Sequence, residues 1–330
     1  MRFTYLLPII IAFSACQNDK KQEAESSDLT KKEVYVPSFN ADSAYYFVDK
    51  QVSFGPRVPN TKGHVETGDY LIAKLKGYGW EVEEQEFQAT TFDKQNLYLR
   101  NIIAGYNPKA QKRILLAAHW DTRPWADADD SRQDEPILGA NDGASGVGVL
   151  IELARVIGQN DSLKVGVDII LFDGEDWGND ASTQDYVPVT GDFESWWCLG
   201  SQYWSKNKHR RNYSAYYGIL LDMVGGKDAK FYIEGHSNYY APSIVEKVWG
   251  KASQLGYDRY FVRKQGGAIT DDHYFVNKIG KIPMIDIIPT DPVDGSFGSF
   301  HHTHADNMDI ISKETLDAVG VTLLNVIYRE

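Results

Sequence analysis

Four short, continuous apolar runs, each ending in or leading to polar residues, constrain the fold of this chain more than any other feature. They are RILLAAHWD (113–121), VDIILFDGED (167–176), YGILLDMV (217–224) and PMIDIIP (283–289). Such runs are typical of strands buried on both faces of a sheet. Helical patterns lie between and after them, at 146–157, 241–255 and 312–328. This alternation predicts an α/β fold: a single three-layer α/β/α domain with a mixed, mostly parallel, twisted central sheet.

The segment before the first run predicts two helices and two more strands. The helices are expected at 42–52 and 66–78, and the strands at 81–92 and 97–106. Two long irregular stretches, 124–138 and 178–197, remain as loops. Loops of this length inside a compact domain usually have a function.

The N-terminus has the pattern of an export signal. Arg2 is followed by an apolar run over 3–13, too short to span a bilayer, and then by Ser14, Ala15 and Cys16. A Cys after small residues resembles a bacterial lipoprotein signal, although Phe13 stands where Leu is usual; an ordinary secretory signal with a chance Cys is the alternative.

The lipoprotein interpretation predicts a signal peptide over 1–15, lipidation at Cys16, a flexible tether over 16–39 and a catalytic domain over 40–330. The protein is then exported and held at the cell envelope, in the periplasm or at the outer membrane, through the lipid anchor alone.

Composition narrows the function classes. The chain has 34 Lys and Arg against 46 Asp and Glu, a net charge of -12, which disfavours nucleic acid as a partner. Its two cysteines exclude a disulfide scaffold, and Cys198 has no partner if Cys16 carries lipid. The many aromatic residues suit an aromatic-lined pocket. A monomer is the default expectation.

Acidic and histidine side chains gather where the predicted strands end. These residues are His119, Asp121, Asp142, Glu175, Asp176, Asp222, Asp271, Asp272, His273, His301, His302 and His304. In open α/β sheets, ligands bind beyond the carboxyl ends of the strands. Buried acids are costly unless a metal or hydrogen bonds hold them. Carboxylate and imidazole together suit zinc.

Each of these groups also has an ordinary structural interpretation. His119 could make a structural hydrogen bond, Asp142 could cap a helix, Asp271 could cap another, and the three histidines could lie on the surface. Their joint occurrence at successive strand ends favours a metal site.

Six of these motifs occur in the order found in the zinc aminopeptidase superfamily. They are HWD (119–121), GANDGASG (139–146), FDGED (172–176), LLDMVG (220–225), DDH (271–273) and HHTHADN (301–307). Together with FGPRVPNTKGHVETGDYL (54–71), they resemble most closely the glutaminyl cyclase branch, in its bacterial members of the animal type. The resemblance covers the chain from about residue 40 to the C-terminus.

The resemblance implies a ligand set and an activity. One zinc per chain would be held by Asp142, Asp176 and His302, with Glu175 as general acid/base. Asp222 and Asp271 would form an acidic hydrogen-bond network on the pocket floor. The enzyme would be a glutaminyl-peptide cyclotransferase, an acyltransferase that converts the N-terminal Gln of peptides or proteins to pyroglutamate and releases ammonia.

The chain departs from the animal pattern at two positions. Asp176 stands where many animal members have Glu, and His301 stands where they have Trp. Substrate stacking could then fall to Trp125, Trp196 or Trp197. His119 and His301 are further candidates for the substrate pocket.

Two other functions remain open on the residues alone. A two-zinc aminopeptidase could use His119, Asp142, Asp176, Asp222 and His302 as its ligands, although the DDH triplet favours the cyclase. A third possible function is that of a non-catalytic lipoprotein that binds peptides. It is disfavoured because Asp142, Glu175, Asp176 and His302 are all present.

Overall fold

The computed structural model of the chain describes residues 1–4, 34–179, 186–293 and 295–330. A compact unit runs from Tyr35 to Glu330. It begins before the predicted boundary at residue 40, because Val36 and Phe39 pack against the main hydrophobic core. The predicted cleavage site and Cys16 lie outside the described residues. No helix in the described part of the chain is long and apolar enough to cross a membrane.

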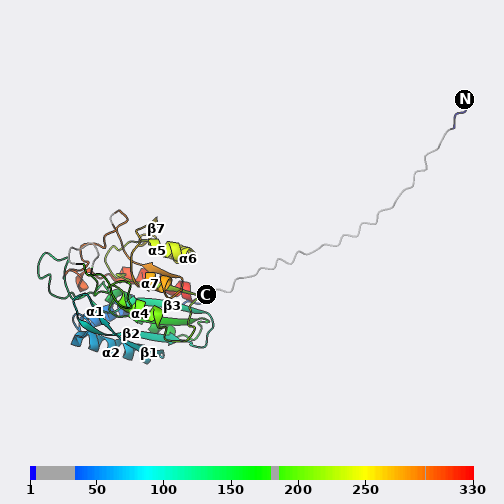
Figure 1. Ribbon diagram of the computed structural model, residues 1–330. Coiled ribbons are helices and arrows are strands. Elements are labelled where there is room, and N and C mark those ends of the chain that lie inside the picture. The colour runs from blue at the N-terminus through cyan, green and yellow to red at the C-terminus, as the bar shows by residue number, and fades with distance from the viewer. Residues whose placement is uncertain (5–33, 180–185, 294) are drawn as a thin grey trace. The chain divides into compact units, whose positions relative to one another are not determined.

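A six-stranded sheet forms the centre of this unit (Figure 1). In spatial order its strands are β1 (Glu81–Thr90), β2 (Asn96–Tyr106), β4 (Gly166–Phe172), β3 (Arg113–His119), β5 (Tyr217–Leu221) and β8 (Met284–Ile287). The pairs β4–β3, β3–β5 and β5–β8 are parallel, whereas β1–β2 and β2–β4 are antiparallel. The mixed, mostly parallel sheet predicted from the apolar runs is therefore confirmed.

Helices cover both faces of the sheet. They are α1 (Ala41–Val52), α2 (Lys62–Gly77), α3 (Ala144–Gly158), α4 (Leu199–Lys206), α5 (Gly235–Tyr240), α6 (Pro242–Gln254), α7 (Asp272–Lys278) and α8 (Lys313–Ile327). Along β3, Ile114 and Leu116 pack into the cluster that contains α1, α3, α6 and α8, whereas Leu115 packs into the cluster that contains α4 and α7. A strand with apolar neighbours on both faces must be apolar throughout, which explains the continuous runs.

The strands are shorter than the apolar runs predict, and this difference places the site. β3 ends at His119 and β4 ends at Phe172, so the acids that follow lie in turns beyond the sheet. Gly174 has φ 71°, a left-handed conformation that glycine adopts without steric cost, and it starts the turn that carries Glu175. The pattern also missed α4, a short helix η1 (Met308–Ile310) and a small parallel pair, β6 (Phe231–Ile233) with β7 (Phe261–Gln265).

The lowered pKa of His209 in the folded protein predicts that the stability of the fold depends on pH. Its Nδ1 accepts a hydrogen bond from the indole nitrogen of Trp204 at 3.1 Å, and burial lowers the pKa of His209 to about 4. Since the unfolded side chain titrates near about 6.5, the unfolded state binds more protons between these values, and stability falls as the pH drops through them.

We expect the wild type to lose about 1–2 kcal/mol more unfolding free energy than His209→Gln between about pH 7.5 and about pH 5, a figure reduced for partial exposure. Urea unfolding of both proteins at both pH values measures this difference. Equal losses would contradict it.

Candidate metal and catalytic site

Two buried carboxylates hold the turns that carry the site. Asp121, just beyond β3, accepts the backbone N–H groups of Glu175 and Asp176, both at 3.1 Å. Asp306 accepts those of Asn141 and Asp142 at 2.7 and 3.0 Å. Both carboxylates are fully buried. Each turn is therefore fixed at the residues whose side chains face the site.

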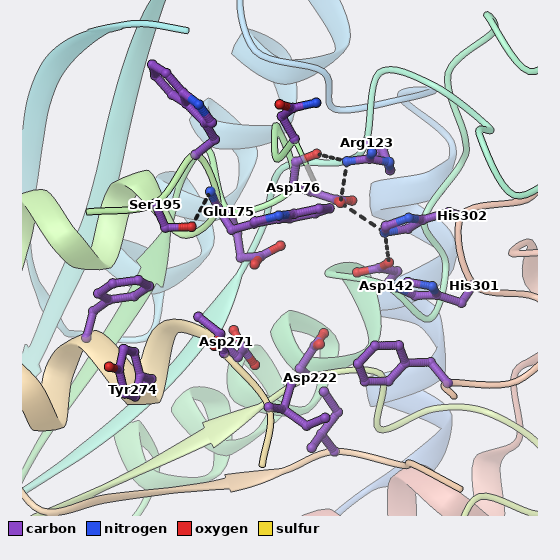
Figure 2. Close-up of a pocket in the computed structure, with 18 of the residues that line it drawn as sticks. Arg123, Asp142, Glu175, Asp176, Ser195, Asp222, Asp271, Tyr274, His301 and His302 are labelled. Carbon is purple, nitrogen blue, oxygen red and sulfur yellow. Dashed lines mark hydrogen bonds and ion pairs between the residues drawn. The ribbon is translucent and has the colours of Figure 1, made fainter. Parts of the chain in front are cut away.

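His302 lies between the carboxylates of Asp142 and Asp176 (Figure 2). Its Nε2 is 3.3 Å from Oδ1 of Asp176 and 3.9 Å from Oδ2 of Asp142. Both oxygens of Asp176 are buried and lack a hydrogen bond of good geometry among the described residues, although Oδ1 also lies 3.8 Å from Nη1 of Arg123. Buried oxygens without donors, beside an imidazole nitrogen, are the ligand types that zinc takes. The predicted ligand set of Asp142, Asp176 and His302 thus fits a zinc ion.

Two rings hold the imidazole of His302 in place. Its ring stacks on His301 at 3.6 Å between centroids and on Trp197 at 5.8 Å. Burial and the neighbouring His302 lower the pKa of His301 to about 3, which keeps His301 neutral. Side-chain atoms of Asp142, His301 and His302 lie within 4.8 Å of one another, so His301 is also within reach of a metal bound there.

His119 lies beneath these residues. It is buried, and its Nε2 is 3.0 Å from Oδ1 of Asp142 and 3.2 Å from Oδ1 of Asp222. The imidazole of His119 and the carboxylates of Asp142 and Asp222 are the ligand types that a second zinc ion would need. Nε2 of His119 is hydrogen-bonded to Asp222, whereas its Nδ1 is buried without a hydrogen-bond partner among the described residues.

A cavity of about 740 Å³ opens over the site, within the usual range for ligand pockets. Glu175, Asp222 and Asp271 line it together with the three predicted zinc ligands. Burial, with the charges of Asp271 and Asp176, raises the pKa of Glu175 well above its usual range. Burial, with Asp142 and Asp271 nearby, raises the pKa of Asp222 to about 7. These carboxyl groups can therefore hold protons near neutral pH.

Asp271 caps a helix, and its catalytic role stays a prediction. It is the N-cap of α7, where its Oδ1 accepts the N–H of Asp272. Its Oδ2 is buried, with no hydrogen-bond partner among the residues described. Side-chain atoms of Glu175, Cys198 and Asp271 lie within 4.8 Å of one another. The carboxylate of Asp271 is therefore close to Glu175, and on its other side it lies close to the buried Asp286.

Three of the residues expected in the substrate pocket line the cavity. Trp196, Trp197 and His301 line the cavity, together with Tyr274 and Phe297.

His119 and Trp125 are not among the described lining residues, so the expectation that they contact substrate is not supported. Burial beneath Asp142 and Asp222 removes His119 from the cavity. Trp125 packs edge-on against Trp177 instead.

Sequence reasoning missed three residues that touch the site. Arg123 and Asp127 come from the acidic loop, and Arg123 donates to the main-chain oxygen of Asp176 at 3.0 Å. The Cys198 thiol donates to Oε1 of Glu175 at 3.1 Å, and its N–H donates to the Glu175 carbonyl at 2.9 Å. Nothing in the local pattern of these residues distinguishes them from other loop residues.

The ligand set predicts the metal content. We expect about one zinc per chain, and a loss of zinc affinity of roughly 100-fold or more in His302→Ala, because one of three protein ligands is removed. Elemental analysis and chelator competition measure both quantities. Two tightly held zinc ions per chain would show that His119 and Asp222 are also ligands.

Comparisons with known proteins agree with this geometry. Residues 101–327 match the family model described as peptidase family M28. A glutaminyl cyclase of Bacteroides thetaiotaomicron bound to N-acetylhistamine is 52% identical, with a TM-score of 0.84 over 90% of this chain and 100% of that one. A Zn-dependent exopeptidase of Parabacteroides distasonis is 51% identical, with a TM-score of 0.85 over the same shares.

A curated relative points the same way. The glutaminyl-peptide cyclotransferase of Drosophila melanogaster is 25% identical over 291 residues, 81% of this chain and 75% of that protein. The chain belongs to peptidase family M28 and, within it, to the glutaminyl cyclase group that its motifs resemble.

Proposed function

We propose that this chain is a zinc-dependent glutaminyl-peptide cyclotransferase that acts on peptides or proteins with an N-terminal Gln. The observation that carries the proposal is the meeting of Glu175 and Asp271 in one cavity, beside the proposed zinc ligands. Cyclisation needs a group that moves a proton between two nearby nitrogens, and a second that holds the departing one. These two carboxyl groups supply them.

Glu175 moves the proton. The α-amine of the substrate attacks its own γ-carbonyl carbon and closes a five-membered lactam. Glu175 takes a proton from that amine and gives it to the departing nitrogen, which leaves as ammonia. Zinc, when bound by Asp142, Asp176 and His302, polarises the γ-carbonyl oxygen as a Lewis acid. The raised pKa of Glu175 suits a group that must both accept and donate.

Asp271 and Asp222 organise the leaving group. Oδ2 of Asp271 is free to accept from the departing NH₂. Asp222, with its pKa near 7 and its oxygen bonded to His119, can hold a proton beside Asp271. Close carboxylates cannot all ionise cheaply, so one shared proton among them stabilises the group.

The aromatic wall limits access of water to the reacting atoms. Trp196, Trp197 and Phe297 line the cavity. Gly178 has no side chain because an added Cβ would lie inside the Trp197 ring, so this glycine is needed to seat the indole. Keeping water out favours attack by the amine over hydrolysis.

A two-zinc aminopeptidase is the second candidate. The cluster of His119, Asp142 and Asp222 has the residue types of a second metal site, with all three atoms within 4.8 Å. It is ranked lower because the DDH triplet gives Asp271 a role in cyclisation and none as a metal ligand.

The cellular location is also part of the proposal. We infer that the chain is exported and anchored at the cell envelope by lipid on Cys16, as its N-terminal pattern indicates. Cys16→Ser should release an active, soluble enzyme, and a variant that stays with the membranes would contradict the anchor. A monomer remains the expected state.

One assay separates the candidate functions. We expect the purified protein to release ammonia from Gln-Ala and to leave Ala-Ala intact, with activity lost to a chelator and restored by Zn²⁺. Mass spectrometry of both peptides measures cyclisation and hydrolysis together. Hydrolysis of Ala-Ala would support the aminopeptidase, and no reaction with either peptide would support a binding protein.

Glu175→Gln tests the proton shuttle. The change keeps the side chain's size and leaves the zinc ligands in place, so turnover should fall by roughly 100- to 10,000-fold with zinc still bound. Turnover on Gln-Ala and zinc content are measured on the same sample. A variant with most of its activity would show that another group moves the proton.

Asp271→Asn tests the grip on the leaving nitrogen. An amide can present a donor where an acceptor is needed, so turnover should fall roughly 30- to 1000-fold, or about 2–4 kcal/mol. Zinc content should not change, because Asp271 is not among the proposed ligands. Loss of zinc, or cyclisation at the wild-type rate, would require a different role for Asp271.

A further inference from the structure

The outer nitrogen of His302 faces a carboxylate that the reaction does not use. Nε2 of His302 faces Asp142 and Asp176, whereas Nδ1 lies 3.5 Å from Oδ1 of Asp127. The ring thus has ligand carboxylates at one nitrogen and a separate carboxylate at the other. Histidines that bind metals commonly donate their second N–H to such a group, which fixes the ring's orientation and raises its basicity.

Asp127 is itself held in place. Arg123 donates to it from Nε at 2.8 Å and also from Nη2, a two-point contact that fixes a carboxylate in one plane. The same guanidinium is buried and donates to the main-chain oxygen of Asp176. One cation therefore connects the carboxylate behind His302 to the turn that carries another zinc ligand.

The loop also contacts the backbone at His302. The N–H of Ala128 donates to the carbonyl oxygen of His302 at 3.2 Å. His302 has φ 56°, a left-handed conformation that a residue with a Cβ rarely adopts. The contact from Ala128 helps to hold a backbone that would otherwise relax.

We propose that Asp127 is a positioning residue for the zinc site. It accepts the Nδ1–H of His302 and so presents an unprotonated Nε2 between Asp142 and Asp176. The inference rests on the proposed function, because it takes His302 as a zinc ligand. It goes beyond that function by assigning a role to the acidic loop over 124–138.

The same loop supplies a matched control. Asp129 accepts from the ring of His304 at 2.8 Å and from its N–H at 2.9 Å. This is a second carboxylate–histidine pair, two residues further along each segment, and its histidine is not among the proposed ligands. Asp129→Ala therefore removes a loop contact of the same kind without removing the one behind His302.

Zinc affinity of the metal-stripped protein, measured by chelator competition at one pH, is the principal test. Asp127→Ala should weaken zinc binding by about 10- to 100-fold. Asp127→Asn keeps an acceptor oxygen, so its zinc affinity should lie between those of the wild type and Asp127→Ala. Asp129→Ala should change affinity by less than about 3-fold, since it does not act on a ligand.

Proton NMR of the zinc-loaded proteins gives a second readout. The wild type and Asp129→Ala should show a downfield Nδ1–H resonance from His302, which Asp127→Ala loses through exchange with water.

The outcomes distinguish a failure of the proposed function from a failure of the role assigned to Asp127. A wild type that binds no zinc would overturn the proposed function itself. A wild type that binds zinc, with Asp127→Ala binding it equally well, would overturn only the role of Asp127. Equal losses in Asp127→Ala and Asp129→Ala would also overturn it, because general docking of the loop would then explain the effect.

Discussion

The site depends on two buried carboxylates that each accept two consecutive backbone N–H groups. Asp121 holds the turn of Glu175 and Asp176, and Asp306 holds the turn of Asp142. Leaving a buried N–H unsatisfied costs about 1–3 kcal/mol, so each carboxylate strongly favours one conformation of its turn. Asp142, Asp176 and Glu175, the proposed zinc ligands and proton shuttle on these turns, are thereby placed by backbone hydrogen bonds to other carboxylates.

The many carboxylates around the site repel one another, and positive charge nearby offsets this repulsion. Arg57 supplies part of this charge from a fully buried position, where it donates to the carbonyl oxygens of Trp120 and Gly139. Burial lowers the pKa of Arg57 to about 10, which still leaves it charged near neutral pH, close to Asp121 and Asp306. Its position in the upstream FGPRVPN segment explains why that stretch accompanies the site motifs. The proposed zinc ion would supply further charge on the cavity side, where Oδ1 of Asp176 lies 3.3 Å from His302 and 3.8 Å from Arg123.

The sheet, and the presence of a site at its edge, were predictable from local sequence patterns, whereas the individual ligands and their roles followed from the resemblance to the glutaminyl cyclase group and stay predictions. A strand buried on two faces must be apolar, and acids that follow such strands must meet at one edge. The contacts of Asp127 and Cys198 were not predictable, because they depend on how two long loops fold back over the strand ends. His119 illustrates the same limit: its place at the end of β3 indicated the site, but only the structure shows that it bonds Asp222 beneath the cavity.

The hydrogen bond between His119 and Asp222 fits the one-zinc site that we propose for cyclisation in a fold shared with aminopeptidases. Hydrolysis of a peptide bond needs an activated water, which a second metal would provide between these two side chains. In the one-zinc site that we propose, these side chains are hydrogen-bonded to each other instead, and burial raises the pKa of Asp222 to about 7, so that Asp222 can hold a proton. The nucleophile for cyclisation is already part of the substrate, so the site has only to orient it, move one proton and exclude water. In the proposed function, Glu175, Asp271 and the aromatic wall of the cavity provide those three functions with one zinc ion.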